Sequence, residues 1–564
     1  MFQSRHFKHW PTHLPRKLEP PTKTIFQNLV VSAERFPEKT AIVFYGTTIS
    51  YRDLLKQTES LAAYLRDDCH VKKGDRVILD LQSSPQFVIG YYAILALGGL
   101  VVPISPMNVA DEINHYCTDS GARVAIASQD VVKEFKDALD KNFIDRLIVA
   151  TYSDFIAKDF IGEIPTNIAE EKIAFNIAQV MDWSSIPQEN INLKQTEINL
   201  SDLAAILYTS GTTGRPKGCM HTHETIMRNI EGAVLWEGMS STSVLLTTAP
   251  LFHVTGMQHS MNAGVAASGS LVILPRWDPK IAGELIERYA CTHWANVPTM
   301  VVDLLAEPTV ETRDLSSLEN IFGGGSSMPE SVAQELFDRC GIRYMEGYGM
   351  TEAISQTHMN PPQDLRKQCL GIPTFDTMAT IIDPETLREL GPNETGEIVA
   401  SGPQIMLGYW ERDDANKESF IEINGDRFFR TGDLGRYDED GFFYISDRIK
   451  RMINASGFKV WPAEVEATLY KHPAIKELAI ISSPDPRRGE TVKAMIVLKE
   501  AYKNSTSEKE IIDWSREHMA SYKIPRLVEF VIELPRSASG KIQWRLLQED
   551  EWQQQSQMIR TIHK

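Results

Sequence analysis

The sequence predicts an α/β protein with a large N-terminal domain, a β-rich subdomain and a small α+β C-terminal domain. Short apolar segments such as 76–79 and 124–127 alternate with helical stretches, a pattern typical of parallel-rich sheets covered by helices. From about residue 380 the apolar segments shorten, and Gly, Asp and Pro between them indicate β-rich packing. The length of 564 residues also exceeds what one hydrophobic core supports, so more than one domain is expected.

The individual elements follow in chain order. Residues 1–22 contain four prolines and are expected to form an irregular lead-in, and 24–65 to form a helix, short strands and a second helix. A helix is predicted over 86–97. Strands are predicted at 41–44, 76–79, 100–103, 124–127, 147–149, 243–249, 270–274, 319–324, 397–400 and 442–445. A charged patch follows at 447–451, and the domain boundary is predicted at 447–450, although composition alone would favour a solvated turn there.

One segment has nearly the length of a membrane span. Residues 87–104 carry no charge over 18 positions. However, Gly98, Gly99 and Pro103 interrupt it, and Ser84-Pro85 is a typical helix start. The segment is therefore predicted to be a helix followed by a buried strand, and no integral membrane segment is expected.

Composition excludes some classes of function. A net charge of −17 argues against a nucleic-acid partner, which would require a basic face. The six cysteines show no CxxC spacing, which favours free thiols over disulfides or a zinc site. The N-terminus lacks an apolar core of signal-peptide length, so a cytoplasmic protein is expected. The sequence leaves a homodimer open.

The most informative segment is 208–218, YTSGTTGRPKG. Its glycines let backbone N–H groups turn toward an anion, and its hydroxyls and Lys217 add donors and a positive charge. This combination predicts a phosphate-binding loop. It differs from the Walker A pattern, because Pro216 stands where that pattern has a glycine. A solvated turn is the alternative for any Ser/Thr/Gly-rich segment.

Three further segments carry groups suited to a nucleotide. The run 344–352, YMEGYGMTE, offers an aromatic ring for a base, a hydroxyl for a phosphate and a carboxylate for Mg²⁺. In 428–433, FFRTGD, an aspartate could accept ribose hydroxyls, or it could simply cap a turn. In 535–542, PRSASGKI, a lysine stands in a Ser/Gly loop, where a lone lysine is normally solvated.

Together these segments resemble, in order, the motifs of the adenylate-forming superfamily, which includes acyl-CoA synthetases, firefly luciferase and peptide-synthetase adenylation domains. The resemblance spans about 25–545. It implies that ATP phosphates are bound by Thr209, Ser210, Gly211, Thr212, Thr213, Gly214 and Lys217. It also implies that Tyr348 stacks on adenine, that Thr351 contacts the α-phosphate and that Glu352 coordinates Mg²⁺.

The resemblance assigns further roles downstream. Asp433 and Arg448 would contact the ribose, and Lys450 falls at the family's hinge position. Lys541 would bridge the substrate carboxylate and the α-phosphate, carried into the site by a mobile C-terminal domain. The implied organisation is an AMP-binding domain over 1–446, a hinge over 447–450 and a mobile domain over 451–564.

Other matches concern the acid and the thiol. The segment 250–256, PLFHVTG, resembles the motif whose histidine, here His253, lies at the acyl pocket, although a buried structural histidine is the alternative. The run 323–327 resembles the segment that lines adenine and the acyl group; it supplies Gly324 and Gly325, and Gly323 with Gly324 is interpreted as leaving room for an acyl chain. Ser456 and Gly457 resemble the loop that forms the pantetheine tunnel.

The implied activity is an acid–thiol ligase that uses ATP, Mg²⁺ and coenzyme A to activate a small-molecule carboxylic acid through acyl-AMP. The motif sequences most resemble those of medium- to long-chain fatty-acid–CoA ligases. A ligase for aryl acids such as benzoates or cinnamates is the alternative. No aspartate stands between 254 and 266 to hold an amino-acid substrate. An acyl-AMP ligase that feeds a carrier protein would carry an insertion before the hinge, and none is seen. A nucleotide-binding regulatory protein without catalysis is the alternative from another class.

Overall fold

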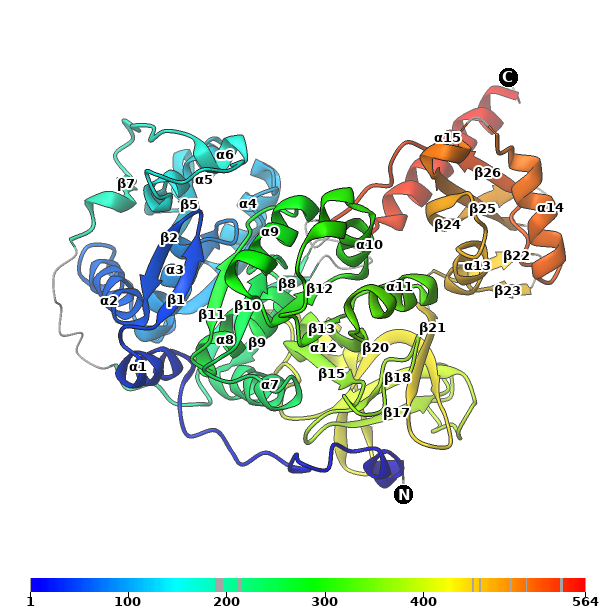
Figure 1. Ribbon diagram of the computed structural model, residues 1–564, viewed down its shortest axis with the longest axis horizontal. Helices are drawn as coiled ribbons and strands as arrows, with labels where there is room; N and C mark the ends of the chain where they lie inside the picture. The colour runs from blue at the N-terminus through cyan, green and yellow to red at the C-terminus, as the bar shows by residue number, and fades with distance from the viewer. Residues whose placement is uncertain are drawn as a thin grey trace.

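A computed structural model describes residues 2–187, 196–209, 216–448, 451–455, 458–485, 489–503, 505–537 and 541–562. Figure 1 shows a main body and a smaller C-terminal part, coloured orange to red, that projects from one side. The sequence-predicted α/β class is confirmed by sheets layered with helices in the body and by a small α+β unit after it.

The first sheet has the order β7-β6-β5-β3-β4-β8-β9. Its neighbours are parallel except for the antiparallel pair β8 and β9. The strands are β3 (Arg76–Asp80), β4 (Leu100–Pro103), β5 (Val124–Ser128), β6 (Arg146–Ala150), β7 (Val180–Asp182), β8 (Leu203–Thr209) and β9 (Lys217–Thr222). The near-continuous burial of β3 to β6 is what a parallel sheet covered on both faces requires.

The second sheet has the order β16-β15-β14-β13-β12-β10-β11-β1-β2. The central strands β14, β13, β12, β10, β11 and β1 are mutually parallel, and antiparallel strands lie at the two ends of the sheet. Its strands are β1 (Thr40–Phe44), β2 (Thr47–Ser50), β10 (Val244–Thr247), β11 (Ser270–Ile273), β12 (His293–Asn296), β13 (Asn320–Gly323), β14 (Met345–Met350), β15 (Ser355–Met359) and β16 (Ile372–Pro373).

Two smaller sheets complete the fold. The antiparallel subdomain sheet contains β17 (Met378–Ile382), β18 (Gly396–Ser401), β19 (Phe420–Ile423), β20 (Asp426–Tyr437) and β21 (Phe443–Arg448). The C-terminal sheet contains β22 (Ile453–Ala455), β23 (Phe458–Val460), β24 (Ile475–Asp485), β25 (Gly489–Leu498) and β26 (Leu527–Phe530). The chain therefore leaves one sheet and enters the next between residues 448 and 453.

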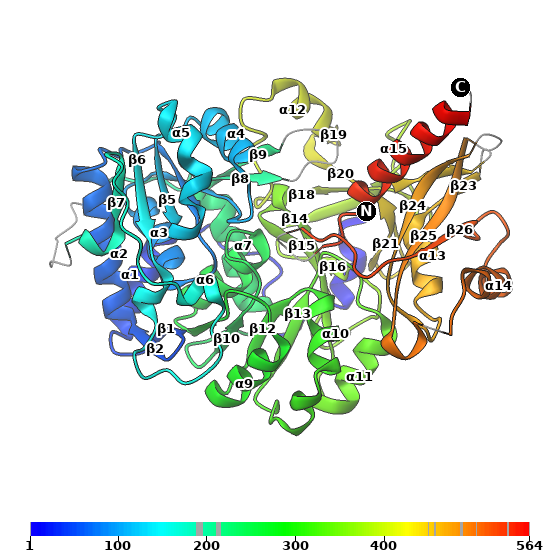
Figure 2. The same cartoon turned by 90° about the horizontal axis from the view of Figure 1, so that it is seen from above.

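Helices form three layers around the two large sheets, as Figure 2 shows. A central layer shares its core with both sheets: α1 (Ile25–Arg35), α2 (Tyr51–Asp67), α3 (Pro85–Ala96), α7 (His223–Trp236) and α8 (Ala263–Ala266). The outer layers are α4 (Ala110–Ser120) with α5 (Lys136–Asp140), and α9 (Pro279–Tyr289) with α10 (Pro298–Ala306) and α11 (Glu330–Cys340). The remaining helices are α6 (Thr166–Ala169), α12 (Asp413–Ser419), α13 (Pro462–Leu469), α14 (Glu508–His518) and α15 (Trp544–Ile562).

The uncharged segment at 87–104 is a core element. Ser84 caps α3 by accepting a hydrogen bond from the Phe87 N–H, and Pro85 is the first helical residue. Every residue of α3 is buried, because the helix packs between the two large sheets. Among the described residues, no helix combines the length and the apolar character needed to cross a bilayer.

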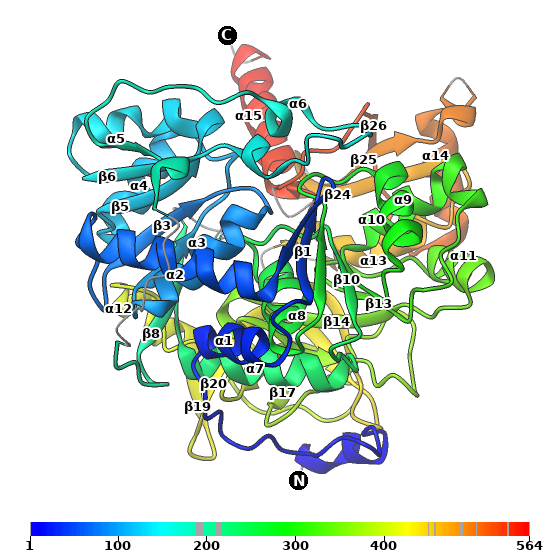
Figure 3. The same ribbon diagram turned by 60° about the vertical axis from the view of Figure 1, so that its left-hand side comes forward.

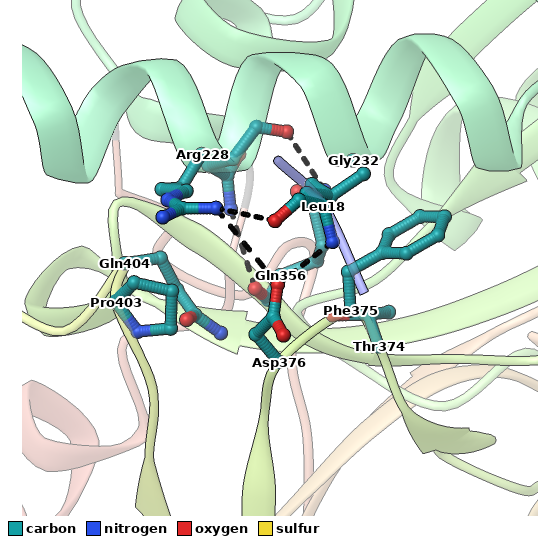
Figure 4. Close-up of a pocket in the computed structure, with 10 residues that line it drawn as sticks. Leu18, Arg228, Gly232, Gln356, Thr374, Phe375, Asp376, Pro403 and Gln404 are labelled. Atoms are coloured by element: carbon teal, nitrogen blue, oxygen red, sulfur yellow. Dashed lines mark hydrogen bonds and ion pairs between the residues drawn. The ribbon is translucent and has the colours of Figure 1, made fainter. Parts of the chain in front are cut away.

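The proline-containing N-terminal segment begins with a 3₁₀ turn at Phe2–Lys8 and then crosses the main body (Figure 3). Trp10 packs edge-on against Trp236 and Phe375, with ring centroids 5.1 and 5.3 Å away. Figure 4 shows Arg228 and Asp376 meeting around Leu18: Arg228 donates to the Leu18 carbonyl at 2.9 Å, and Asp376 accepts from its N–H at 2.9 Å. The segment thus ties α7 to the strand-rich subdomain.

Asp80, at the end of β3, is a carboxylic acid buried in the protein interior. Its side chain is fully buried, and among the described residues neither carboxyl oxygen has a hydrogen-bond partner. Burial, and then the neighbouring charge of Asp130, raise the pKa of Asp80 well above 3.8. The folded protein therefore holds a proton here that the unfolded chain releases near its ordinary pKa.

This arrangement predicts a pH-dependent stability penalty. Because the folded-state pKa is raised, the stability contributed by protonated Asp80 is present below about pH 4 and is lost as the pH rises toward the folded pKa. Relative to the wild type, Asp80→Asn should gain melting temperature progressively from pH 4.5 to pH 8, measured by calorimetry. The exposed control Asp159→Asn should show no such trend. A constant Asp80→Asn difference across this range would contradict the assignment.

Candidate active site

The predicted phosphate loop connects two strands of the first sheet. β8 and β9 pair in antiparallel register, with Thr209 opposite Lys217. Thr209 and Lys217 therefore stand at the two stems of the loop. Ser210, Gly211, Thr212, Thr213 and Gly214, which the sequence predicts as phosphate contacts, lie outside the described residues.

The stems are anchored on α4. The Tyr208 hydroxyl donates to Asp119 at 2.8 Å, and Asp119 also forms an ion pair with Arg412. On the other stem, His115 Nε2 bonds the Pro216 carbonyl at 3.1 Å. Two positions on one helix thus hold both ends of the loop.

The adenine and ribose candidates come from different sheets and meet directly. Tyr348 lies in β14 and Asp433 in β20, and the Tyr348 hydroxyl donates to Asp433 Oδ2 at 2.7 Å. Both side chains are buried. Arg448 is opposite Asp433 in the β20–β21 register, so its backbone reaches the same place.

Thr351 and Glu352 form a 3₁₀ turn, Thr351–Ala353, between β14 and β15. The turn ends in a left-handed residue, Ile354, with φ of 52°. His221 in β9 bonds the Thr351 carbonyl at 2.8 Å, and the Tyr409 hydroxyl donates to Glu352 Oε1 at 2.8 Å. The turn that carries the predicted metal ligand is thus joined to the strand that follows the phosphate loop.

Lys541 reaches the main body from the C-terminal unit. A Cβ atom built on Gly325 would lie only 2.6 Å from Lys541 Cε, so the lysine stem passes directly over this glycine, whose φ is +87°. Burial, and then the positive charge of Lys541, lower the pKa of His253 from 6.5 to about 3. Lys541, Gly325 and His253, which are far apart in the sequence, therefore share one site, with His253 neutral at physiological pH.

Close backbone packing, and not space for a substrate, explains why positions 323 and 324 are glycines. A Cβ at Gly323 would lie 2.0 Å from the Asn296 carbonyl oxygen, and one at Gly324 would lie 2.4 Å from the Gly347 carbonyl oxygen. These glycines are required by close backbone approach between neighbouring strands. The interpretation of Gly323 and Gly324 as open room for an acyl chain was wrong.

The segment that follows His253 is a π-helix, Gly256–Asn262, packed on α7. Its polar side chains are buried, and those of Gln258, His259 and Asn262 bond to their surroundings, whereas the Ser260 hydroxyl has no hydrogen-bond partner among the described residues. His259 lies 2.5 Å from Glu237 and 2.9 Å from Ser355 Oγ, and the Asn262 amide donates to Gln258 at 2.7 Å. π-helical segments of this kind are frequent at functional sites.

In the charged patch at 447–451, the described side chains of Asp447 and Arg451 pack against neighbouring residues and do not form a solvated turn. Asp447 is buried and accepts from the Ala463 N–H at 2.7 Å, which places it at the start of α13. Arg451 donates to Glu466 at 2.5 Å. Lys450, Ser456 and Gly457 lie outside the described residues.

The donor set suits magnesium bound together with phosphates. Mg²⁺ in phosphate-transfer sites takes one or two carboxylates and completes its shell with phosphate oxygens and waters. Glu352 supplies one carboxylate within the same group of contacts as Lys217, and among the described residues no cluster of three or more His, Cys, Asp or Glu side chains forms a metal cage. The residues fit a metal that arrives with the nucleotide.

Sequence reasoning missed the segment around Tyr409. The Tyr409 hydroxyl bonds Glu352, and the centroid of its ring lies 4.2 Å from Lys217 Nζ. The backbone N–H of Trp410 donates to the Gly218 carbonyl at 2.7 Å. The only sequence signal was an aromatic pair after a glycine, at 408–410, in a region otherwise typical of turns.

Known proteins are similar to this chain over most of its length. The family model described as AMP-binding enzyme matches residues 29–410, and its C-terminal domain matches 464–541. The chain is 35% identical to a long-chain-fatty-acid–CoA ligase of Bacillus subtilis, over 96% of this chain and 97% of the relative. It is 31% identical to a feruloyl-CoA synthase of an Amycolatopsis species, over 90% and 95%.

Among solved structures, the anthranilate CoA ligase AuaEII in complex with anthranoyl-AMP superposes with a TM-score of 0.81 at 25% identity, over 96% of this chain and 99% of that one. The sequence-based assignment to the adenylate-forming enzymes is confirmed. The chain belongs to the AMP-binding enzyme family and is an ATP-dependent acid–thiol ligase with CoA as co-substrate.

Proposed function

We propose that this ligase activates medium- to long-chain fatty acids. The relatives named as long-chain-fatty-acid–CoA ligases cover nearly the whole chain, at 29–35% identity. Near His253, Gln258, His259 and Asn262 of the π-helix already bond one another or their neighbours, so these three side chains do not require a polar substituent on the acid. Aryl acids are the second candidate, because the relatives also include the feruloyl-CoA synthase and the anthranilate ligase.

In the proposed first step, a carboxylate oxygen of the acid attacks the α-phosphorus of ATP, the bond to the β-phosphate oxygen breaks, and pyrophosphate leaves. Lys217, the loop amides and Thr351 would neutralise charge on the phosphates, and Mg²⁺ held through Glu352 would supply additional positive charge. Tyr348 would stack on adenine, and Asp433 with Arg448 would bind the ribose. His253 would lie beside the acid and, because it is neutral, would not form an ion pair with the substrate carboxylate.

Lys541 would be the cation that lets two anions approach. The observation that supports this most strongly is its position over Gly325 beside His253. In the second step, the CoA thiolate attacks the acyl carbonyl and AMP leaves. We infer that the C-terminal domain, 451–564, rotates about Lys450 between the steps, which withdraws Lys541 and brings the Ser456-Gly457 loop to the site.

Removing the Lys541 ammonium should abolish adenylation selectively. Lys541→Ala should slow ATP–pyrophosphate exchange by on the order of 10²–10³, by analogy with a lost oxyanion donor, yet still convert supplied acyl-AMP and CoA to thioester. The control Lys509→Ala changes an exposed lysine on α14 and should leave both steps intact. Unchanged exchange in Lys541→Ala would sink the assignment.

Restricting the hinge should separate the two steps. Proline fixes φ near −65°, so Lys450→Pro should spare pyrophosphate exchange and reduce thioester formation, whereas Lys450→Ala should leave both half-reactions intact. Both half-reactions are measured on the same preparation. Equal loss of the two in Lys450→Pro would count against rotation at this residue.

A panel of acids tests the substrate class. CoA consumption is measured with aliphatic acids from two to eighteen carbons and with benzoates and cinnamates, at equal concentrations. We expect the highest kcat/KM among medium and long aliphatic chains. Activity confined to the aryl acids would overturn this choice in favour of the second candidate.

A further inference from the structure

One buried side chain contacts both charged groups that the proposed function assigns to Mg·ATP. The Tyr409 hydroxyl donates to Glu352 Oε1 at 2.8 Å, and the face of its ring receives the Lys217 ammonium at 4.2 Å from the centroid. Only 5% of Tyr409 is exposed. A hydrogen bond to a carboxylate and a cation over an aromatic face are both attractive, and both strengthen when water is excluded.

The backbone of Tyr409 is fixed from two sides. Its N–H donates to Asn416 Oδ1 at 2.6 Å, and the Asn416 amide donates back to its carbonyl at 3.0 Å. On the opposite side it forms a β-bridge with Cys219, two residues beyond Lys217. The ring is therefore held between α12 and β9, and it does not rely on Glu352 or Lys217 for its own position.

The charges on either side of this ring are opposite in sign. Among the described residues, no ion pair joins Lys217 to Glu352. A direct pair would occupy the ammonium needed for phosphate and the carboxylate needed for Mg²⁺, and the nucleotide would have to break it. The ring and hydroxyl of Tyr409 give each charge a neutral partner instead.

We propose that Tyr409 is a positioning residue of the Mg·ATP site, which orients Glu352 through its hydroxyl and holds Lys217 on its ring, so that the two charges stay separate and available. This inference rests on the proposed roles of Glu352 and Lys217. It requires Tyr409 to act through these two residues, without touching the nucleotide itself.

The test is ATP binding as a function of Mg²⁺, measured by isothermal titration calorimetry on the full chain without acid or CoA. Tyr409→Phe keeps the ring and removes only the hydroxyl. It should raise the Mg²⁺ concentration at half-saturation roughly 10-fold, the scale of one lost hydrogen bond to a charged group, and change metal-free ATP binding little. Tyr409→Leu also removes the ring face, and should weaken metal-free binding as well, because Lys217 loses its support.

Tyr51→Phe is the matched control. Tyr51 lies in α2, and this substitution removes a buried hydroxyl that donates to the Gly269 carbonyl at 2.7 Å. It should leave the Mg²⁺ dependence at the wild-type value. In a Glu352→Gln background, Tyr409→Phe should have no further effect on Mg²⁺ dependence, whereas a merely structural role would add to the loss. Asn416→Ala, which loosens the backbone of Tyr409, should shift the dependence in the same direction by a smaller factor.

Equal Mg²⁺ dependence in Tyr409→Phe and Tyr51→Phe would overturn the inference, as would full additivity of Tyr409→Phe with Glu352→Gln. These results are independent of the acid. If the wild type binds Mg·ATP but forms no thioester with any fatty or aryl acid, the proposed substrate class fails, and the binding data still decide the role of Tyr409.

Discussion

The passage of Lys541 over Gly325 is the contact on which the arrangement of the whole chain depends. A lysine at residue 541 can stand beside His253 only if the C-terminal sheet is held against the main body, and only if residue 325 has no side chain. Asp447, which accepts from the N–H of Ala463 at the start of α13, and the partly buried pair of Arg451 and Glu466 stabilise the same region. The described orientation therefore places the lysine where the carboxylate and the α-phosphate are proposed to meet.

Around that contact, neutral side chains keep charged groups in place. Tyr409 links Glu352 to Lys217, Tyr208 links the phosphate-loop stem to Asp119, and the hydroxyl of Tyr348 bonds Asp433. Each tyrosine presents a hydrogen-bond donor to a carboxylate whose polar atoms would be costly to leave without a partner, and Asp119 also pairs with Arg412. The proposed nucleotide would then meet carboxylates and ammonium groups that are already oriented, which lowers the cost of ordering them on binding.

Much of the fold follows from local patterns. Strand β3 and helix α3 were predicted within one or two residues, because continuous apolar runs and a Ser-Pro helix start are local signals. The motifs around Tyr348, Asp433 and Lys541 were recognisable because their residues are adjacent in the chain. Their convergence, the contacts of Tyr409 and the close approach at Gly323 depend on strands that are distant in sequence, and no periodicity reports them. Asp80 follows three apolar residues of β3, and its carboxyl, which has no hydrogen-bond partner among the described residues, became interpretable only once its burial was seen.

We infer that the described position of Lys541 is the adenylating arrangement, formed before CoA is needed. Rapid mixing of the enzyme with a medium- or long-chain fatty acid and Mg·ATP, without CoA, tests this most directly when acyl-AMP is quantified in the first turnover. If Lys541 is already in place, acyl-AMP should form in a burst close to one per active site, without a lag, and should discharge to thioester when CoA is added. Acyl-AMP that forms only in the presence of CoA, or only after a slow lag, would contradict it.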